Sequence, residues 1–171
     1  MVGLPTENDD DIQATANLLL TIKRKNPGLR LKLGVSTFVP KAHTPFQWNG
    51  VNSKAKKRLN TLAKYLKPNG IDFRPESYNW SLIQALISRS DRRLAVVIAT
   101  LSRSHNTIGE WKKAYKAIEE NNKTSKGNER LPPWDEVIHK EWNTKRTLPW
   151  THIDAPLSNQ QLINHREKSL S

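Results

Sequence analysis

The sequence of 171 residues contains no cysteine. Without a thiol, the chain can form no disulfide bond, no thiolate zinc site and no cysteine nucleophile. For the same reason, thiolates of this chain can hold no iron–sulfur cluster. A chain of this length can still bury a core without disulfides or metal.

Long apolar runs are also missing, so the sequence predicts no membrane-spanning helix. Hydrophobic residues make up 36%, yet six Trp and several periodic apolar stretches predict an ordered fold. The first eleven residues carry acids where a secretory signal would carry Lys or Arg, so we expect a cytoplasmic protein.

Acidic residues are absent from one long segment, residues 21–71, which we call the basic block. It holds twelve Lys or Arg, whereas residues 1–20 hold four acids and no Lys or Arg. The formal net charge of +12 therefore belongs mainly to this block. Such a block attracts RNA or another polyanion through its field and counterion release. The alternative is that these side chains only keep the protein in solution.

The N-terminal half alternates between short apolar stretches and amphipathic helices. A capping-box pattern at Thr6–Asp9 and a Ser at position 53 predict two helix starts. The order of strand, helix, strand, helix and strand predicts parallel strands, too few to complete a sheet. The expected elements are a strand end at 1–5, a helix over 6–26, a strand over 30–39, a helix over 53–67 and a short strand over 71–73.

The pattern changes near residue 75, where we place a domain boundary between 1–75 and 76–171. Beyond it, apolar spacing predicts mainly helices, the last one capped by Ser158. A polar stretch at 119–130 predicts a flexible loop.

Two segments at the ends of predicted strands are candidate sites. Gly3-Leu4-Pro5 would let a ligand approach the backbone, or would simply be a strand-to-helix turn. In the loop 41–48, Lys41 and His43 would meet an anion while Phe46 and Trp48 stack on a ring, or the aromatic side chains would bury themselves.

Two further groups have weaker patterns. His152-Ile153-Asp154 has a spacing that sometimes ligates metal, with His105, His139 and His165 elsewhere in the chain, but a hydrogen-bonded turn is the better interpretation. Asp91-Arg92-Arg93 would hold a phosphate, or would form local ion pairs at an exposed helix start.

Four segments resemble one protein family in the same order along the chain. Met1–Glu7 resembles a segment of radical S-adenosylmethionine (radical SAM) enzymes. Ser36–Trp48 is similar to a more specific segment of the radical SAM proteins that carry an N-terminal cobalamin-binding domain. Asp91–Leu94 and Leu148–Asp154 resemble C-terminal segments of that family.

The resemblance implies an α/β fold class, with the last βα units of an incomplete (β/α) radical SAM barrel over residues 1–75. A mainly α-helical C-terminal extension with irregular Pro- and Trp-containing segments would occupy 76–171. In the family, a 4Fe–4S cluster on a Cys-x₃-Cys-x₂-Cys loop binds S-adenosylmethionine and cleaves it to a 5′-deoxyadenosyl radical, while the protein positions the cofactors.

The resemblance also assigns residues to the S-adenosylmethionine side of the site. It assigns no metal ligand and no catalytic residue to this chain, and it leaves the substrate open. The seven assigned residues are Val2, Gly3, Leu4, Val35, Ser36, Thr37 and Phe38.

The chain departs from the family because the cluster loop, the early strands and the cobalamin domain are missing. We therefore expect a C-terminal part of such an enzyme that binds no cofactor and has no activity alone. It would come from a split gene, from a truncated gene model or from a chosen part of a longer gene. Its partner would be the missing N-terminal portion. Two other hypotheses are an RNA-binding module that uses the basic block, including Lys54, Lys57, Arg58 and Lys64, and a non-catalytic partner subunit.

Overall fold

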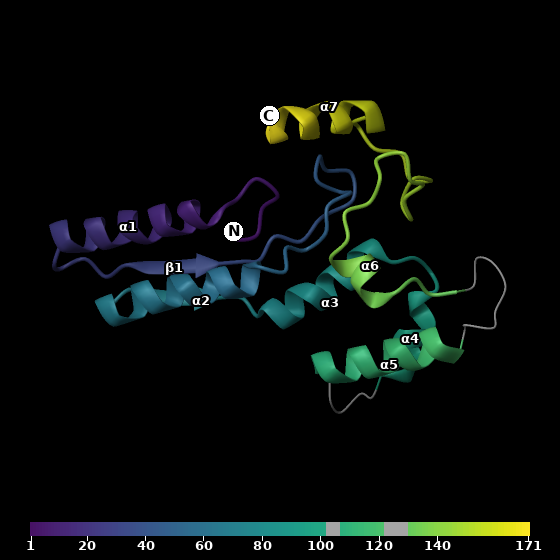
Figure 1. The fold of residues 1–171 in the computed structure, drawn as a ribbon, viewed down its shortest axis with the longest axis horizontal. Coiled ribbons are helices and arrows are strands. Elements are labelled where there is room, and N and C mark those ends of the chain that lie inside the picture. Colours follow the sequence, from purple (N-terminus) through teal and green to yellow (C-terminus); the bar gives the residue numbers. More distant parts are fainter. Residues whose placement is uncertain (102–106, 122–129) are drawn as a thin grey trace. The chain divides into compact units, whose positions relative to one another are not determined.

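The structure is a computed structural model that describes residues 1–101, 107–121 and 130–171. The chain divides into two compact units. Unit 1 consists of residues 1–38 and 52–81, and unit 2 of residues 39–51 and 82–171. The chain therefore leaves unit 1 after Phe38 and returns to it at Asn52 (Figure 1).

Unit 1 is a small parallel sheet with two long helices. Strands β1 and β2 run parallel with Leu33 opposite Phe73, and Val2 forms a parallel bridge with Thr37. The predicted parallel direction is confirmed. The elements are α1 (Asp9–Lys25), β1 (Lys32–Val35), α2 (Ala55–Leu66), the 3₁₀ helix η1 (Lys67–Asn69) and β2 (Asp72–Pro75).

The two helix caps predicted for unit 1, at Thr6 and Ser53, are not observed. Helix α1 is capped by Asn8, whose Oδ1 accepts hydrogen bonds from the N–H groups of Asp10 and Asp11 at 2.7 and 3.1 Å. Three acids in its first turn suit the positive end of the helix dipole. The Ser53 cap is also wrong, because α2 begins after Lys54 without a side-chain capping bond.

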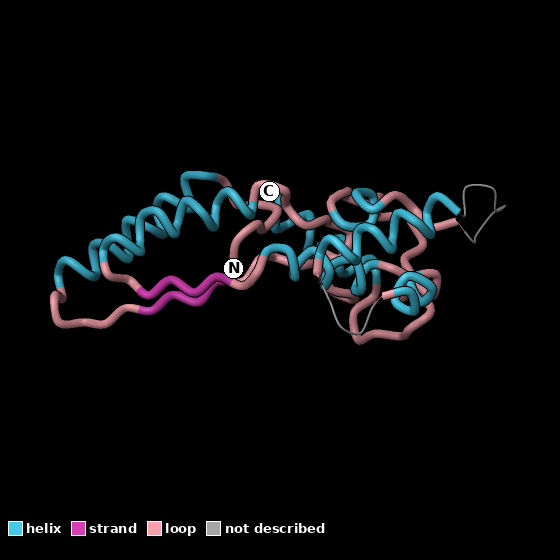
Figure 2. The backbone as a smooth tube through the Cα atoms, turned by 90° about the horizontal axis from the view of Figure 1, so that it is seen from below, coloured by secondary structure: helices cyan, strands magenta, loops and turns pink. Residues whose placement is uncertain are grey.

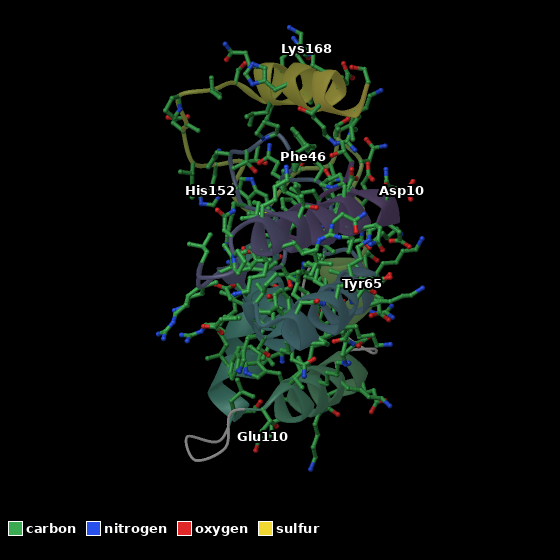
Figure 3. All side chains as sticks on the ribbon, turned by 90° about the vertical axis from the view of Figure 1, so that its left-hand side faces the viewer. Asp10, Phe46, Tyr65, Glu110, His152 and Lys168 are labelled. Atoms are coloured by element: carbon green, nitrogen blue, oxygen red, sulfur yellow. The ribbon has the colours of Figure 1, made fainter. Side chains whose placement is uncertain are left out.

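Both helices of unit 1 cover the same face of the strands (Figure 2). That face bears Leu33, Val35 and Phe73, which pack into the core of the unit. The side chains of Asp10 on α1 and Tyr65 on α2 are exposed (Figure 3). The opposite face of the strands is exposed and polar, with Lys32, Gly34, Asp72 and Arg74. The buried core residues are Val2, Ile12, Ala16, Val35, Ala55, Leu59, Leu62, Leu66, Ile71 and Phe73.

The prediction of an incomplete (β/α) barrel in residues 1–75 is wrong. Helices account for 52% of the described residues, and the sheet within that part of the chain has two strands of four residues each. The strand predicted over 30–39 is confined to Lys32–Val35, the following Thr37 forms only an isolated bridge with Val2, and the chain leaves unit 1 after Phe38. Two short strands and one bridge cannot curve into a closed sheet.

Unit 2 is built from helices around the loop 39–51. The Ser158 cap of the last helix is confirmed, with Gln161 completing a capping box. The predicted loop 119–130 begins later, because α5 continues to Asn121, and its part at 122–129 lies outside the described residues. The helices are α3 (Tyr78–Arg89), whose first turn belongs to unit 1, α4 (Leu94–Thr100), α5 (Ile108–Asn121), α6 (Trp134–Ile138) and α7 (Asn159–Leu170).

The core of unit 2 contains Trp48, Trp142, Leu148, Trp150 and Leu162. The rings of Trp142 and Trp150 lie 6.5 Å apart between centroids. Among the described helices, none combines the length and apolarity needed to cross a membrane.

Candidate functional site

The residues assigned to S-adenosylmethionine lie side by side in unit 1, and we call Val2–Leu4 together with Val35–Phe38 the strand-end edge. The Val2 N–H donates to the carbonyl of Ser36 at 2.9 Å, and the Phe38 N–H donates to the carbonyl of Val2 at 2.7 Å. The carboxyl ends of neighbouring parallel strands meet at one edge of a sheet, where α/β proteins commonly bind ligands.

Gly3 forms the turn that follows the first of these segments. Its φ of +90° lies in the region that favours glycine, and a Cβ there would lie 3.0 Å from that of Ala55. The Gly3 N–H donates to both carboxylate oxygens of Glu7 at 3.0 Å. In this conformation, the close approach at Gly3 is made by α2 and the N–H is bonded within the chain.

Arg58 joins this turn to the start of α1. Although it belongs to the basic block, its side chain is buried and donates to Glu7 and Asp9 at 2.8 Å each. Burial opposes its charge, but the hydrogen bonds and charges of Asp9 and Glu7 outweigh burial and hold the pKa of Arg58 above its ordinary value. The hydrogen bond from Arg58 lowers the pKa of Asp9.

Thr37 supplies a buried polar atom at the strand-end edge that lacks a hydrogen-bond partner among the described residues. The residue is 4% exposed, and its Oγ1 has no hydrogen-bond partner within the described part of the chain. A buried hydroxyl without a partner carries an energetic cost and marks a place where a ligand atom would be favourable.

The loop 41–48 is held inside unit 2 by Gln47. Its Oε1 accepts hydrogen bonds from the His43 N–H at 3.0 Å and from the Trp150 indole at 2.7 Å. Trp48 is 1% exposed, and its carbonyl accepts from the Trp142 N–H at 2.8 Å. For Trp48, the structure favours the packed alternative over stacking on a ligand.

Arg89 is a buried cation at the end of α3. It is 1% exposed, and its guanidinium donates to the carbonyls of Val137, Ile138 and Lys140 and stacks 3.8 Å from the Trp142 ring. Burial, and secondarily the charge of Arg146, lowers the pKa of Arg89 to about 10. These contacts tie α3 to the end of α6.

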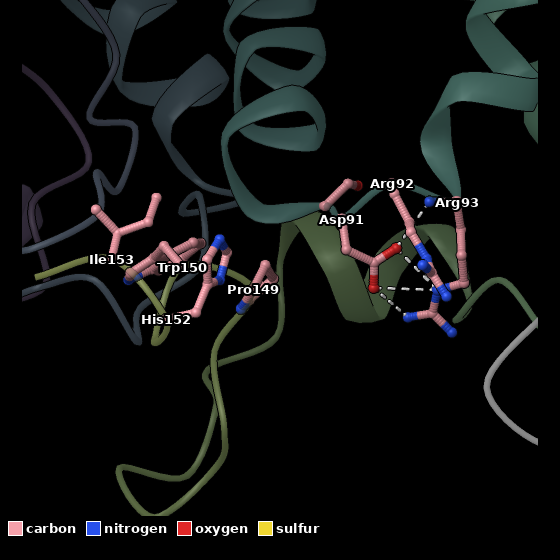
Figure 4. A pocket seen from close by; sticks show the side chains of 8 residues that line it. Asp91, Arg92, Arg93, Pro149, Trp150, His152 and Ile153 are labelled. Carbon is pink, nitrogen blue, oxygen red and sulfur yellow. Dashed lines mark hydrogen bonds and ion pairs between the residues drawn. The ribbon is translucent and has the colours of Figure 1, made fainter.

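Two segments that the sequence predicted as separate candidate sites lie next to each other in unit 2. One cleft of about 720 Å³ is lined by Ser90 and Asp91–Arg93 and, from the other segment, by Pro149, Trp150, His152 and Ile153 (Figure 4). Sequence reasoning missed this convergence because the two segments lie far apart in the chain. Their shared resemblance to one family was the available signal.

No group of three or more His, Cys, Asp or Glu side chains gathers within the described residues in a way that would hold a metal ion. His105 lies outside those residues. His152 lies in a turn in which the Ile153 N–H donates to the Trp150 carbonyl at 3.0 Å, as the turn interpretation expects.

The basic block presents part of its charge to the outside. The side chain of Arg58 is excluded from this surface by burial, unlike its neighbours on α2. The exposed lysines of α2 and its ends are Lys54, Lys56, Lys57, Lys64 and Lys67.

Comparison with known proteins finds a distant relative among the curated proteins. No protein-family model matches the chain, and no solved structure matches it. The uncharacterized protein MJ0966 of Methanocaldococcus jannaschii is 33% identical over 95 residues, which are 56% of this chain and 21% of that protein. The chain therefore matches about a fifth of the length of its relative.

Proposed function

We propose that this chain is the C-terminal portion of a radical SAM enzyme and that its strand-end edge contacts S-adenosylmethionine. The observation that carries the proposal is the hydrogen bonding of Val2 to Ser36 and Phe38. The resemblance assigns both segments to one cofactor, and they are neighbours in space. The much greater length of the archaeal relative is consistent with a missing portion.

The residues present fit the nucleoside end of this cofactor. The Thr37 hydroxyl, which has no hydrogen-bond partner among the described residues, would bond a polar atom of the adenosine once the edge opens, because Thr37 is only 4% exposed in this conformation. When bound to a reduced 4Fe–4S cluster, S-adenosylmethionine supplies a 5′-deoxyadenosyl radical. The cluster ligands must come from another portion or partner, because this chain has no cysteine. A cytoplasmic location is part of the proposal.

The experiment is a titration of the full ¹⁵N-labelled chain with S-adenosylmethionine, followed by amide chemical shifts. The sequence-based expectation is that the chain alone binds no cofactor; the proposal departs from it, and we expect weak, saturable shifts at Val2, Gly3 and Thr37 even without the cluster. Thr37→Val should weaken binding about three- to tenfold, the effect of one lost hydrogen bond. It should leave stability unchanged or raised, because the hydroxyl has no hydrogen-bond partner among the described residues.

Thr61→Val is the matched control. Thr61 lies on α2 and its hydroxyl donates to the Lys57 carbonyl, away from the strand-end edge. It should leave binding unchanged. Absence of shifts at the edge, or equal effects of the two valine variants, would contradict the proposal.

The exposed lysines of α2 favour a second candidate function, RNA binding. The basic block itself contains no acidic residue, so binding through its exposed lysines should weaken steeply as salt rises. Charge reversal of Lys54, Lys57 and Lys64 should abolish it, whereas Arg58 must be left intact because it is buried.

The matched control reverses three lysines of α5, Lys112, Lys113 and Lys116, which are also exposed. A filter-binding or anisotropy assay with a transfer-RNA-sized RNA would measure both sets. Equal losses in both variants, or no binding at low salt, would exclude this candidate.

A further inference from the structure

The cleft of unit 2 has the size of a small-molecule site. Its volume of about 720 Å³ falls in the range in which proteins bind metabolite-sized ligands. One wall is the turn from Ser90 to Arg93 between α3 and α4, and the other is the turn from Pro149 to Ile153 (Figure 4).

The first wall is cationic. Asp91 is engaged by Arg93, whose Nε and Nη2 donate to its carboxylate at 2.7 to 3.0 Å. Arg92 is exposed, and its guanidinium makes no hydrogen bond to a described residue. The Asp91–Arg93 pair stabilises the turn and leaves the guanidinium of Arg92 available to a ligand.

A buried positive charge lies next to this wall. A smaller cavity of about 260 Å³ shares Ser90, Asp91, Arg93 and Pro149 with the cleft and is lined by Arg89 as well. All hydrogen bonds of the Arg89 guanidinium within the described residues go to backbone carbonyls, and its Nε has no partner there. A buried cation without a carboxylate partner is stabilised by an anion nearby.

The second wall is largely apolar. Pro149, Trp150 and Ile153 line it, and Ile153 is 54% exposed despite its hydrophobic side chain. His152 adds a polar ring to the same wall. A ligand that spans the cleft would therefore meet guanidinium groups at one end and an apolar surface at the other.

We propose that this cleft binds a small phosphorylated molecule with a ring, of the chemical class of a nucleoside diphosphate. The phosphate lies at Arg92, in the field of Arg89 and Arg93, and the ring lies against Pro149 and Ile153. Arginine suits this role because its planar fork matches two phosphate oxygens at once. This site is independent of the strand-end edge in unit 1.

The test is calorimetric titration of the full chain at fixed ionic strength with ADP, inorganic phosphate and adenosine. We expect ADP to bind more tightly than either part. Arg92→Gln should weaken ADP about tenfold or more, the effect of a charge-assisted bond. Ile153→Ser should weaken ADP and adenosine while leaving phosphate unchanged.

Arg30→Gln is the matched control, because it removes the same charge from an exposed position in unit 1. It should leave ADP binding unchanged. Arg92 and Ile153 are exposed, so both variants should keep the circular dichroism of the parent chain.

Three outcomes would overturn the proposal. The first is no ADP binding up to about 10 mM, which corresponds to less than about 3 kcal/mol. The second is an equal loss in Arg92→Gln and Arg30→Gln, which would indicate only general attraction to a basic protein. The third is equal affinity for ADP and for either part alone, which would refute a ligand that engages both walls.

Discussion

Replacing Arg58 with Met should destabilise unit 1 by about 3–5 kcal/mol. Arg58 and Glu7 are both nearly inaccessible, with side chains 7% and 8% exposed and an N–O distance of 2.8 Å. Methionine keeps the aliphatic length but leaves the Glu7 carboxylate buried without its cation. The Gly3 N–H still donates to Glu7 and offsets only part of this cost.

Most of this energy belongs to Glu7 rather than to Asp9. The Asp9 side chain is 68% exposed, so water screens its pair with Arg58 and the loss of this pair contributes little to stability. Asp9→Asn should therefore be nearly neutral. Adding Glu7→Gln to Arg58→Met should recover part of the loss, because the buried charge is then removed.

Urea unfolding followed by amide signals in both units would measure these effects. The urea midpoint of unfolding reported by the Leu62 amide in unit 1 should fall, while the midpoint reported by the Val137 amide in unit 2 should not. Arg74→Met is the matched control, since its pair with Asp72 is exposed at 63% and 47% and its loss should destabilise the unit much less. If Arg58→Met costs no more than Arg74→Met, the reasoning about a buried pair is refuted.

Two further predictions concern unit 2. Gly50→Ala should lower stability by about 1–3 kcal/mol, measured in thermal melts, because a Cβ there would lie 2.1 Å from the His139 carbonyl oxygen. Gly28 has open space around it, so Gly28→Ala should not lower stability, and equal shifts of the melting temperature in the two variants would contradict the packing around Gly50. The hydrogen bond from Arg93 lowers the pKa of Asp91, so its contribution is present above the unfolded pKa of about 3.9 and is lost as pH falls through the lower folded value. Urea midpoints should fall less between about pH 5 and pH 2 in Asp91→Asn than in the parent chain, and equal falls would refute this assignment.

Local patterns predicted much of the secondary structure. The helices predicted over 6–26 and 53–67 correspond to α1 and α2, and Ser158 identified the start of α7. These succeed because helix periodicity and capping depend on residues within a few positions of one another. The predicted cap of α1 at Thr6–Asp9 is wrong because Glu7 does not enter the helix. Its carboxylate is held instead by the Gly3 N–H and by Arg58, which is distant in sequence.

The candidate sites depended on longer-range arrangement. The resemblance grouped Val2 with Thr37, and their parallel bridge places them together. The cleft required Arg92 and Ile153 to meet across unit 2, which no local spacing encodes. Composition located the basic block, but only burial separated Arg58 from the exposed lysines beside it.

The sequence by itself determined that no thiolate chemistry can reside in this chain, that its positive charge lies mainly in residues 21–71, and that its strands run parallel. Those properties follow from composition and from the order of elements. Only the tertiary structure decided that the chain leaves unit 1 after Phe38 and that the sheet of the described residues has two short strands. It also decided which charged groups are buried, because the partners of a buried charge come from distant parts of the chain.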